Sequence, residues 1–509
     1  MVRVAELLGS LSLATDLADG FSLEKSLRTT ILAARISTRV GAAPHEQALA
    51  YWTALLRFAG CTAFAHEEAT LYADGDDLGL RRTLAYVDFG RPRTFITRAL
   101  TGIARHASPR VRIAALTRLL GDPGAPRAHA HAQCEVAVGF ARAIGRPDVA
   151  AALDHREERW DGKGPRRQVA EAELPLAARI ADVADTLELF SWSLGVEAAI
   201  EELRARRGGH LDPHLVDACL GALPPLLVGL DEPSVWDLFL SLEPTPQWTV
   251  EAMEPLLRAY SRFADVASVY TLGHSAQVAE LAGKAAAALG LGAEEQCLAR
   301  WAGYTHDLGR VGVATGLWEK VLPLSMIERQ RIRGHSHHTE TILSLSPALG
   351  PVLDVAAATH ERGGGRGYPR RQRLEGLAPV ARVLAAADVY VALISTRPHR
   401  PAFGAPEAVR LLRSETTSGA LERTAVEAVL AATGQRRPAR SEWPGGLSDR
   451  EVQVVRLVAI GRSNPEIGQL LGMSPRTAQK HVMHVYQKLG LESRAGLALW
   501  AMEHQLLEP

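Results

Sequence analysis

The sequence predicts an all-α protein in which two tandem helical domains are followed by a compact four-helix domain. Three observations lead to this prediction. Ala, Leu and Arg recur at helical spacing along most of the chain. Segments of the first half reappear, in the same order, in the second half. Residues 447–509 contain short helical patterns that are separated by capping residues and glycine turns.

The composition limits the possible classes of protein. With 509 residues, of which 47% are hydrophobic and 22% charged, the chain can form several domains with substantial cores. The net charge is zero, so any contact with nucleic acid depends on a local basic surface. The four cysteines are scattered without CxxC spacing, and we find neither a signal peptide nor an apolar run that could span a bilayer. We therefore expect a cytoplasmic protein without membrane contact.

Internal similarity defines the first two domains. Two pairs of segments correspond most clearly: RFAG at 57–60 with RWAG at 300–303, and ARIADVAD at 178–185 with ARVLAAAD at 381–388. Repeats of this kind indicate copies of one structural unit. They predict one helical domain at residues 1–232 and a second copy at residues 250–434.

Polar side chains that can bind a metal follow the helices of the second domain. His306 and Asp307 are adjacent where a hydrophobic helix ends, and an imidazole beside a carboxylate is a ready pair of metal ligands. His274 opens an amphipathic helix, and Asp388 lies on the apolar stripe of another. A buried carboxylate needs a strong partner, because an unpaired charge is costly to desolvate. A metal would be this partner for Asp388; a neighbouring helix end or Arg382 is the alternative.

This order of motifs resembles the HD superfamily of metal-dependent phosphohydrolases, and in particular its HD-GYP branch. GRGYPRR at 365–371 contains the GYP triplet, with His360 shortly before it. His335 matches the intervening ligand histidine of the branch, and STRPHRP at 395–401 matches its closing segment. The likeness extends over residues 260–434.

The resemblance implies a divalent metal centre of one or two ions, with iron or manganese as the expected metals. Six side chains would be its ligands: His274, His306, Asp307, His335, His360 and Asp388. Asp307 would bridge the two ions and, with Arg310, take part in catalysis, while Gly367, Tyr368 and Arg400 would contact the substrate. The implied substrate is a phosphorylated small molecule or a cyclic dinucleotide, cyclic di-GMP in particular.

Three departures from the HD-GYP pattern reduce the expected ligand set. The branch has two consecutive histidines before the glutamate, where this chain has Thr359 and His360. Arg310 replaces the usual lysine, which keeps a positive charge for a phosphate but presents a planar fork. Gly364 replaces the aspartate before the GYP glycine. One metal ion is therefore better supported than two.

The first domain lacks the corresponding ligands. Asp185 matches the last carboxylate of the second domain, but Ala63 and Phe64 stand at the position of the His-Asp pair. Lys25 or Ser26 lies where the first histidine is expected. Because a single carboxylate cannot hold a metal ion, we expect a structural or sensory domain without a metal site.

A polar linker with a basic cluster, residues 435–446, leads to the last domain at residues 447–509. Ser448, Asn464 and Ser474 are predicted to cap its first three helices, two of them followed directly by proline. Two short helices joined by a glycine turn and followed by a polar-faced helix form a helix-turn-helix. Along its whole length this domain resembles the LuxR-type DNA-binding domain.

The LuxR resemblance implies that the third helix enters the major groove of double-stranded DNA. Six side chains are the expected DNA contacts: Arg476, Thr477, Gln479, Lys480, His481 and Lys488. The alternative is a solvated polar face. On the fourth helix, Leu497, Trp500 and Ala501 are either a dimer contact or core residues. A homodimer would explain recognition of paired half-sites.

Together these features predict a DNA-binding transcriptional regulator. Its HD-GYP-like domain would bind metal and sense or hydrolyse a phosphorylated ligand, so that occupancy of one site affects the other. Two alternatives remain open at this point: an active phosphodiesterase that DNA binding merely localises, and a catalytically dead scaffold.

Overall fold

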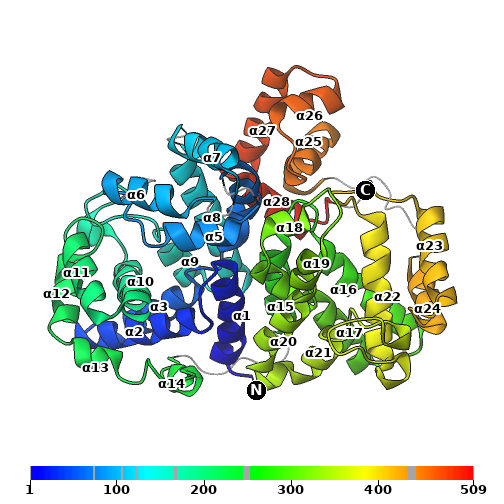
Figure 1. Cartoon of the computed structure of the whole chain (residues 1–509), viewed down its shortest axis with the longest axis horizontal. Coiled ribbons are helices and arrows are strands. Elements are labelled where there is room, and N and C mark those ends of the chain that lie inside the picture. Colours follow the sequence, from blue (N-terminus) through cyan, green and yellow to red (C-terminus); the bar gives the residue numbers. More distant parts are fainter. Residues whose placement is uncertain are drawn as a thin grey trace. The chain divides into compact units, whose positions relative to one another are not determined.

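Every regular element that the structure describes is a helix, which confirms the predicted all-α class (Figure 1). The computed structural model describes residues 2–72, 75–104, 107–121, 124–164, 169–244, 253–433 and 443–507. The chain divides into two compact units, Met1–Ala252 and Met253–Pro509, close to residue 250, where the second domain is predicted to begin. The predicted linker at 435–446 lies outside the described residues up to residue 442.

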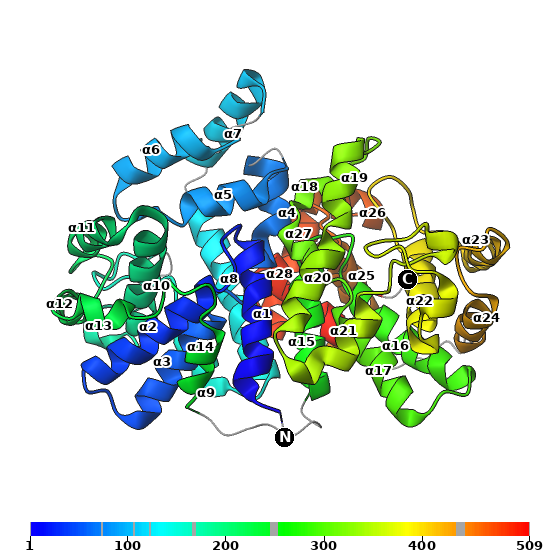
Figure 2. The same ribbon diagram turned by 60° about the horizontal axis from the view of Figure 1, so that its bottom comes forward.

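The N-terminal unit is built around α2 and α10. Its helices are α1 (Val4–Ala18), α2 (Lys25–Arg39), α3 (Pro44–Leu56), α4 (Ala65–Glu67), α5 (Asp77–Leu84), α6 (Pro92–Gly102), α7 (Pro109–Gly121), α8 (Ala125–Ala143), α9 (Pro147–Leu153), α10 (Leu176–Leu194), α11 (Val196–Arg206), α12 (Pro213–Leu220), α13 (Leu223–Leu227) and α14 (Trp236–Ser241). Helix α2 packs against α3 and α10, and these three lie side by side in both ribbon views (Figure 2). Their apolar faces form the centre of the unit, where Tyr51 and Trp52 are fully buried.

The first part of the C-terminal unit repeats this packing with α16, α17 and α22. Its helices are α15 (Met253–Asp265), α16 (His274–Ala288), α17 (Ala293–Thr305), α18 (Thr315–Trp318), α19 (Met326–Arg333), α20 (His335–Ser344), α21 (Gly350–Ala356), α22 (Pro379–Ile394), α23 (Ala405–Thr417) and α24 (Arg423–Ala432). Helix α16 packs against α17, α22 and α24, and α17 packs against α22. Small residues such as Ala279, Ala282 and Ala286 face inward on α16 and allow this close approach.

Four short helices complete the C-terminal unit: α25 (Asp449–Ala459), α26 (Asn464–Leu471), α27 (Pro475–Leu489) and α28 (Arg494–Glu503). Each begins after a serine whose hydroxyl accepts an N–H from the first turn: Ser448, Ser463, Ser474 and Ser493. The predicted caps at Ser448 and Ser474 are confirmed. The prediction for α26 was wrong by one residue, because Ser463 forms a capping box with Glu466 and Asn464 is the first helical residue.

The core of these four helices matches the predicted pattern. Ala478, Val482 and Val485 are buried on α27, and Leu497 and Ala501 are buried on α28. The last two are therefore core residues, which decides between the two roles considered for them. A dimer through this domain stays a prediction.

Among the residues that the structure describes, one helical stretch, Pro44–Tyr72, is long and apolar enough by length and composition to cross a membrane, although no such run was expected from the sequence. The rest of the chain buries 78% of its most apolar window. Burial of this extent is the usual environment of a core helix, because apolar side chains inside a folded unit are shielded from water by their neighbours.

Candidate metal centre and DNA-binding surface

Helix α16 begins at His274 because the residues around it form a tight, hydrogen-bonded turn. Gly273 has a φ of +73°, a conformation that strains residues with a side chain. The carboxylate of Asp265 accepts hydrogen bonds from the backbone N–H (2.9 Å) and the hydroxyl (2.7 Å) of Ser275. His274 is thereby held at the first position of the helix, where it is only 3% exposed.

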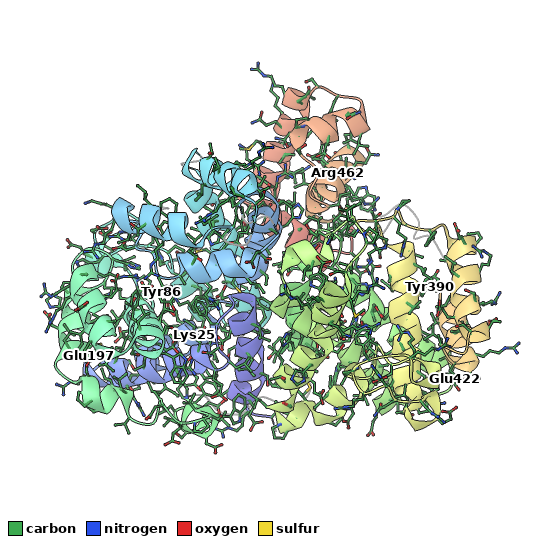
Figure 3. The ribbon with its side chains drawn as sticks, in the orientation of Figure 1. Lys25, Tyr86, Glu197, Tyr390, Glu422 and Arg462 are labelled. Carbon is green, nitrogen blue, oxygen red and sulfur yellow. The ribbon has the colours of Figure 1, made fainter. Side chains whose placement is uncertain are left out.

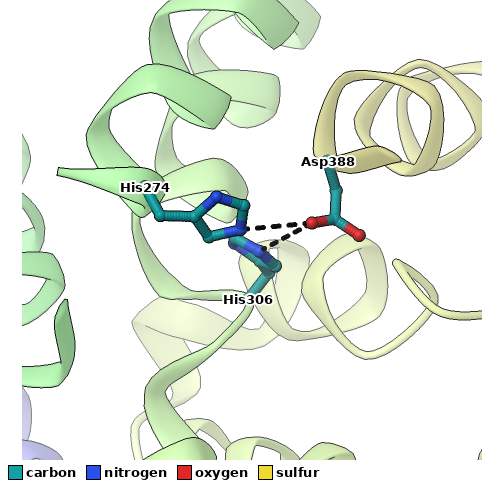
Figure 4. A group of neighbouring side chains, drawn as sticks. All are labelled: His274, His306 and Asp388. Carbon is teal, nitrogen blue, oxygen red and sulfur yellow. Dashed lines mark ion pairs between the residues drawn. The ribbon is translucent and has the colours of Figure 1, made fainter. Parts of the chain in front are cut away.

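The first group of ligand side chains consists of His274, His306 and Asp388. His306 follows the last residue of α17, and its Nδ1 lies 2.8 Å from the carbonyl oxygen of Gly303, so Nε2 is left for the site. Helix α22 brings Asp388 to the same place, with Oδ1 3.2 Å from Nε2 of His274 and 3.8 Å from Nε2 of His306 (Figure 4). Ligand atoms of the three residues all lie within 4.8 Å of one another, close enough to share one ion.

A second group consists of Asp307, His335 and His360, whose ligand atoms also lie within 4.8 Å of one another. His335 begins α20, and its Nδ1 lies 2.6 Å from the carbonyl oxygen of Ile332. Its other nitrogen, Nε2, is 2.8 Å from Nε2 of His360. Two imidazole nitrogens and a carboxylate therefore converge a second time.

Asp307 belongs to the second group, but only one of its two oxygens faces the histidines of that group, and the other faces those of the first. Its Oδ2 is 3.8 Å from Nε2 of His274 and 3.6 Å from Nε2 of His306. Its Oδ1 is 3.4 Å from Nε2 of His335 and 3.5 Å from Nε2 of His360. The structure thus brings all six predicted ligands together, with Asp307 in the position of a bridging carboxylate.

Burial and the neighbouring charges shift the pKa values of this cluster in opposite directions. Burial lowers the pKa of His274 and of His360 to about 4, so both imidazoles are neutral near pH 7. For His306, burial is outweighed by Asp307 and Asp388, which raise its pKa to about 9. Burial opposes the ionisation of both carboxyl groups, yet the adjacent histidines hold the pKa of each well below its usual range. Two ionised carboxylates and neutral imidazoles are the forms that bind metal, and an ion would displace the proton of His306.

Buried atoms without partners show that these residues fit a metal. Within the described part of the chain, Nε2 of His306 and Oδ1 of Asp307 have no hydrogen-bond partner. Buried polar atoms are normally hydrogen-bonded, because leaving them unpaired costs free energy. Imidazole and carboxylate ligands together suit divalent transition metals. The two ligand groups therefore have the side chains of a metal site and contain buried atoms that lack a hydrogen-bond partner.

Arg310 pairs with the central carboxylate. It lies in the 3₁₀ helix Leu308–Gly312, and its Nη1 is 2.9 Å from Oδ2 of Asp307. The indole of Trp318 covers the guanidinium, whose carbon is 3.9 Å from the ring centroid, and donates its N–H to the Arg310 carbonyl at 3.3 Å. Stacking of this kind restricts the guanidinium, so a positive charge is held beside the centre.

The GYP segment packs against the second ligand group. The ring of Tyr368 stacks on the imidazole of His360, with centroids 5.1 Å apart and planes inclined by 15°. A Cβ atom at Gly367 would lie 2.2 Å from the backbone nitrogen of Arg362, so only glycine permits this approach. These residues hold His360 in place, and their contact with a substrate stays a prediction.

Thr359 occupies the position of the missing histidine. It is fully buried, and its hydroxyl donates to the carbonyl oxygen of Ala356 at 2.8 Å. Two residues further on, the carboxylate of Glu361 accepts hydrogen bonds from the backbone N–H groups of Arg370 (2.7 Å) and Gln372 (2.9 Å). Both side chains are therefore engaged in local structure, and neither belongs to the two ligand groups.

Arg400, which was predicted to bind substrate, is hydrogen-bonded to the end of α22. Its guanidinium donates to the carbonyl oxygens of Ala392 (2.6 Å), Leu393 (3.2 Å) and Ser395 (3.3 Å). Unpaired carbonyl groups at a helix C-terminus are commonly satisfied by an arginine in this way. A role of Arg400 toward the substrate stays a prediction.

Arg397 was not singled out from the sequence, although it stands three residues before Arg400 in the same motif. Its guanidinium donates to the carbonyl oxygen of Tyr270 at 3.4 Å. Burial lowers the pKa of Arg397 to about 10, while the negative charges of Asp388 and Asp307 act in the opposite direction. Arg397 is therefore a buried positive charge that interacts electrostatically with the carboxylates of the two ligand groups.

The predicted DNA-binding residues lie along the outer face of α27. Arg476, Thr477, Gln479 and Lys480 are exposed, and His481 is half-buried. Lys488 is also exposed, but its ammonium lies 2.9 Å from Oε2 of Glu451. The first turns of α27 thus present a continuous polar surface of the kind that enters a groove of DNA, and their contacts with DNA stay predictions.

Two protein-family models match the chain: the HD domain at residues 259–424, and the luxR family of bacterial regulatory proteins at residues 446–501. The first range contains both ligand groups and the second contains α25, α26 and α27. The chain carries an HD domain of the HD-GYP type and a LuxR-family helix-turn-helix domain. Both resemblances drawn from the sequence are confirmed.

Some known proteins resemble most of this chain, and others resemble only a short part of it. The 3′3′-cGAMP-specific phosphodiesterase 3 of Vibrio cholerae is 28% identical over 418 residues, which cover 80% of this chain and 90% of that protein. The transcriptional regulatory protein MctR of Rhizobium johnstonii is 38% identical over 61 residues, 12% of this chain and 28% of that protein. A crystal structure of the cyclic GMP-AMP specific phosphodiesterase V-cGAP3 of Vibrio cholerae covers 86% of this chain and 99% of its own, with a TM-score of 0.59 and 23% identity. The last match shows a shared fold.

Proposed function

We propose that this chain is a DNA-binding transcriptional regulator whose HD domain is a metal-dependent phosphodiesterase for a cyclic dinucleotide. The observation that carries the proposal is the pair of ligand groups, with one oxygen of Asp307 near the histidines of each. Iron or manganese would be held by His274, His306 and Asp388 on one side and by His335 and His360 on the other. A divalent ion, when bound, lowers the pKa of water and polarises a phosphoryl oxygen.

The residues of the chain would orient the substrate and balance its charge. Arg310 is fixed beside Asp307 by Trp318, and the buried Arg397 interacts electrostatically with both carboxylates. Positive charge that is already in place stabilises the negative charge that develops on a phosphodiester during attack, and requires no reorganisation at that moment. The two arginines would therefore act on the phosphate, while the ligand groups hold the metal.

A cyclic dinucleotide is the substrate class that the relatives support. The Vibrio cholerae protein that matches 80% of this chain is named for its action on 3′3′-cGAMP. Cyclic di-GMP phosphodiesterases of Pseudomonas aeruginosa and Vibrio cholerae also match part of the chain, over 110 and 133 residues. We propose that the ligand is 3′3′-cGAMP or cyclic di-GMP. We also propose that the protein acts in the cytoplasm and binds DNA as a homodimer.

One observation favours binding without turnover as the second candidate. Thr359 replaces a histidine that the HD-GYP pattern provides, and its hydroxyl is committed to the Ala356 carbonyl. A centre with one ligand fewer binds its second ion more weakly. In that case the HD domain would sense the dinucleotide, and only DNA binding would change.

Hydrolysis in the presence of added metal decides between the two candidates. Purified protein is incubated with Mn²⁺ or Fe²⁺ and with 3′3′-cGAMP or cyclic di-GMP, and linear products are separated by chromatography. Turnover that disappears in Asp388→Ala supports the phosphodiesterase. Saturable binding of a dinucleotide without product supports the sensor. If neither ligand binds and no metal is retained, the proposed role of the HD domain is wrong.

DNA binding is tested separately on α27. Lys480 is exposed, so Lys480→Ala is expected to weaken binding to a fluorescent duplex and to reduce the slope of log K against log salt by about one. Lys488→Ala is the matched control, because Glu451 already neutralises Lys488 and a smaller change is expected. Unchanged binding in Lys480→Ala would contradict the assignment of this face.

A further inference from the structure

The segment between α15 and α16 contacts the DNA-binding helices inside the C-terminal unit. Leu272 packs against their hydrophobic core. The backbone N–H of Gly273 donates to the sulfur of Met502, on α28, at 2.9 Å. A methyl group on Gly461, in the turn that follows α25, would come within 2.8 Å of Cγ1 of Val269. The helix-turn-helix therefore approaches this segment at three separate points.

An ion pair fixes α28 to the helix before the segment. Nη1 of Arg262, on α15, lies 2.7 Å from Oε1 of Glu503, on α28. The side chains are 17% and 33% exposed, so solvent only partly screens the pair. Arg262 and Glu503 can thus hold α28 in the place where Met502 meets Gly273.

The other end of the same segment belongs to the metal centre. His274, a member of the first ligand group, directly follows Gly273 in the chain. The carbonyl oxygen of Tyr270 accepts from Arg397, a buried arginine that interacts electrostatically with Asp388 and Asp307. Between these ends, the hydroxyl of Thr271 donates to the carbonyl oxygen of Asp265 at 2.9 Å and keeps the turn compact. One short, hydrogen-bonded turn is therefore shared by the two sites.

We propose that filling of the metal centre and docking of α28 on the segment Val269–Gly273 stabilise each other. A metal ion held by His274 would restrain further the turn that carries it, and the restrained turn presents Leu272 and the Gly273 N–H to α28. By linkage, docked α28 raises the affinity for metal by the same factor as metal favours docking. The inference rests on the proposed metal centre and gives the HD domain a physical route to the DNA-binding domain.

The Mn²⁺ affinity of the full chain tests this coupling. Isothermal titration is carried out on the wild type, on Glu503→Arg, and on the double variant Arg262→Glu with Glu503→Arg. Reversal of one charge separates α28 from α15, so the dissociation constant for Mn²⁺ is expected to rise about fivefold or more. The double variant restores an ion pair of opposite polarity and is expected to recover wild-type affinity. Met502→Ala provides a second variant that removes the sulfur acceptor without changing charge.

Hydrogen–deuterium exchange gives a readout at a distance from the ligands. Mn²⁺ is expected to slow exchange in the peptide 494–507 of the wild type, which contains none of the six ligand residues, and to leave it unchanged in Glu503→Arg. Equal Mn²⁺ affinity in all variants, with no change in exchange, would overturn the coupling and leave the metal centre intact. Failure of the wild type to bind Mn²⁺ would overturn both the coupling and the proposed function.

Discussion

The N-terminal unit and the HD domain start corresponding helices in the same way but place different chemistry on them. In the N-terminal unit, Glu24 has a φ of +67°, α2 begins at Lys25, and Asp16 accepts the backbone N–H (3.0 Å) and hydroxyl (2.6 Å) of Ser26. In the HD domain, the start of α16 has the same arrangement. The places of Glu24, Lys25, Asp16 and Ser26 are taken there by Gly273, His274, Asp265 and Ser275, in this order. The backbone arrangement is common to both, and the first side chain of the helix differs: an ammonium in one and an imidazole in the other.

Several basic side chains are buried in the N-terminal unit. Figure 3 shows Lys25 in the interior of this unit and Glu197 at its rim. The ammonium of Lys25 pairs with Asp185 and lies 3.9 Å from Oε2 of Glu188. Arg57 lies 2.7 Å from Oδ1 of Asp182. Burial alone would lower the pKa of Lys25, but Asp185 and Glu188 outweigh it and raise the pKa.

The comparison shows two ways to satisfy buried carboxylates in one helical framework. Asp388 lies among histidines, one of which, His306, has a raised pKa and can carry a positive charge, and these are side chains that can also bind a metal. Asp185 has the side chain of Lys25 as its partner. The residue that begins the helix therefore distinguishes a unit with a candidate metal site from one held together by its own ion pairs.

Metal content should separate the two units most strongly. Asp307→Ala removes the carboxylate of the second ligand group, one oxygen of which also lies 3.6 Å from Nε2 of His306 in the first, and metal affinity is expected to fall at least about tenfold. Asp185→Asn in the N-terminal unit is the matched control, and its metal content should equal that of the wild type. Both are measured by elemental analysis after dialysis. Metal retained by Asp307→Ala would sink the assignment of the centre.

The stability of the metal-free chain should show the opposite ranking. Lys25→Met leaves Asp185 and Glu188 buried without the ammonium, which is expected to cost about 3–5 kcal/mol. His274→Ala removes a neutral imidazole, and its expected cost is only about 1–3 kcal/mol. Urea unfolding with EDTA, followed by circular dichroism, measures both. A smaller loss for Lys25→Met would contradict the role of the ion pairs.

The aspartates that hold the two helix starts should respond alike to pH. Burial raises the pKa of Asp16 and of Asp265 to about 7, against an ordinary value of 3.8. The folded chain binds these protons more tightly than the unfolded chain, so their contribution to stability is complete below pH 3.8 and is lost as the pH rises through 7. Asp16→Asn and Asp265→Asn should each flatten the unfolding free energy over this interval. An unaltered pH profile in both would show that these groups do not titrate as described.

A smaller difference should separate the two asparagine variants. Both hydrogen bonds from Ser26 end on Oδ1 of Asp16, and an amide oxygen can accept both. Ser275 uses both oxygens of Asp265, so with asparagine there its hydroxyl must turn from donor to acceptor of the amide N–H. Asp265→Asn is therefore expected to be less stable than Asp16→Asn by about 1 kcal/mol at pH 7.5. Thermal unfolding of the two variants under the same conditions measures this difference.

The helix starts of the DNA-binding domain could be predicted because their signals are local, whereas the full set of six ligands was implied by the HD-GYP resemblance. Serine caps, glycine turns and the spacing of apolar residues each involve residues a few positions apart. The error at α26 came from two adjacent residues, Ser463 and Asn464, that are both good caps. Glu466 decides between them through its bond to the Ser463 backbone N–H.

Long basic side chains were harder to assign. Arg400, Lys488 and Arg310 were predicted to act on ligands, and in the structure they donate to carbonyl groups, to Glu451 and to Asp307. Arg397, which was not predicted, is buried, donates to the carbonyl oxygen of Tyr270 and interacts electrostatically with Asp388 and Asp307. A flexible arginine or lysine can reach several partners from one backbone position, so its direction depends on what the rest of the fold offers.

The sequence by itself determined that the chain is helical, where its DNA-binding helices begin, and that His274, Asp307 and Asp388 face the interior. Those properties follow from caps and periodicity within single helices. Only the tertiary structure decided that each oxygen of Asp307 faces a different pair of histidines and that the turn before His274 also meets α28. These relations join side chains from separate helices, and packing of the whole unit sets the distances between them.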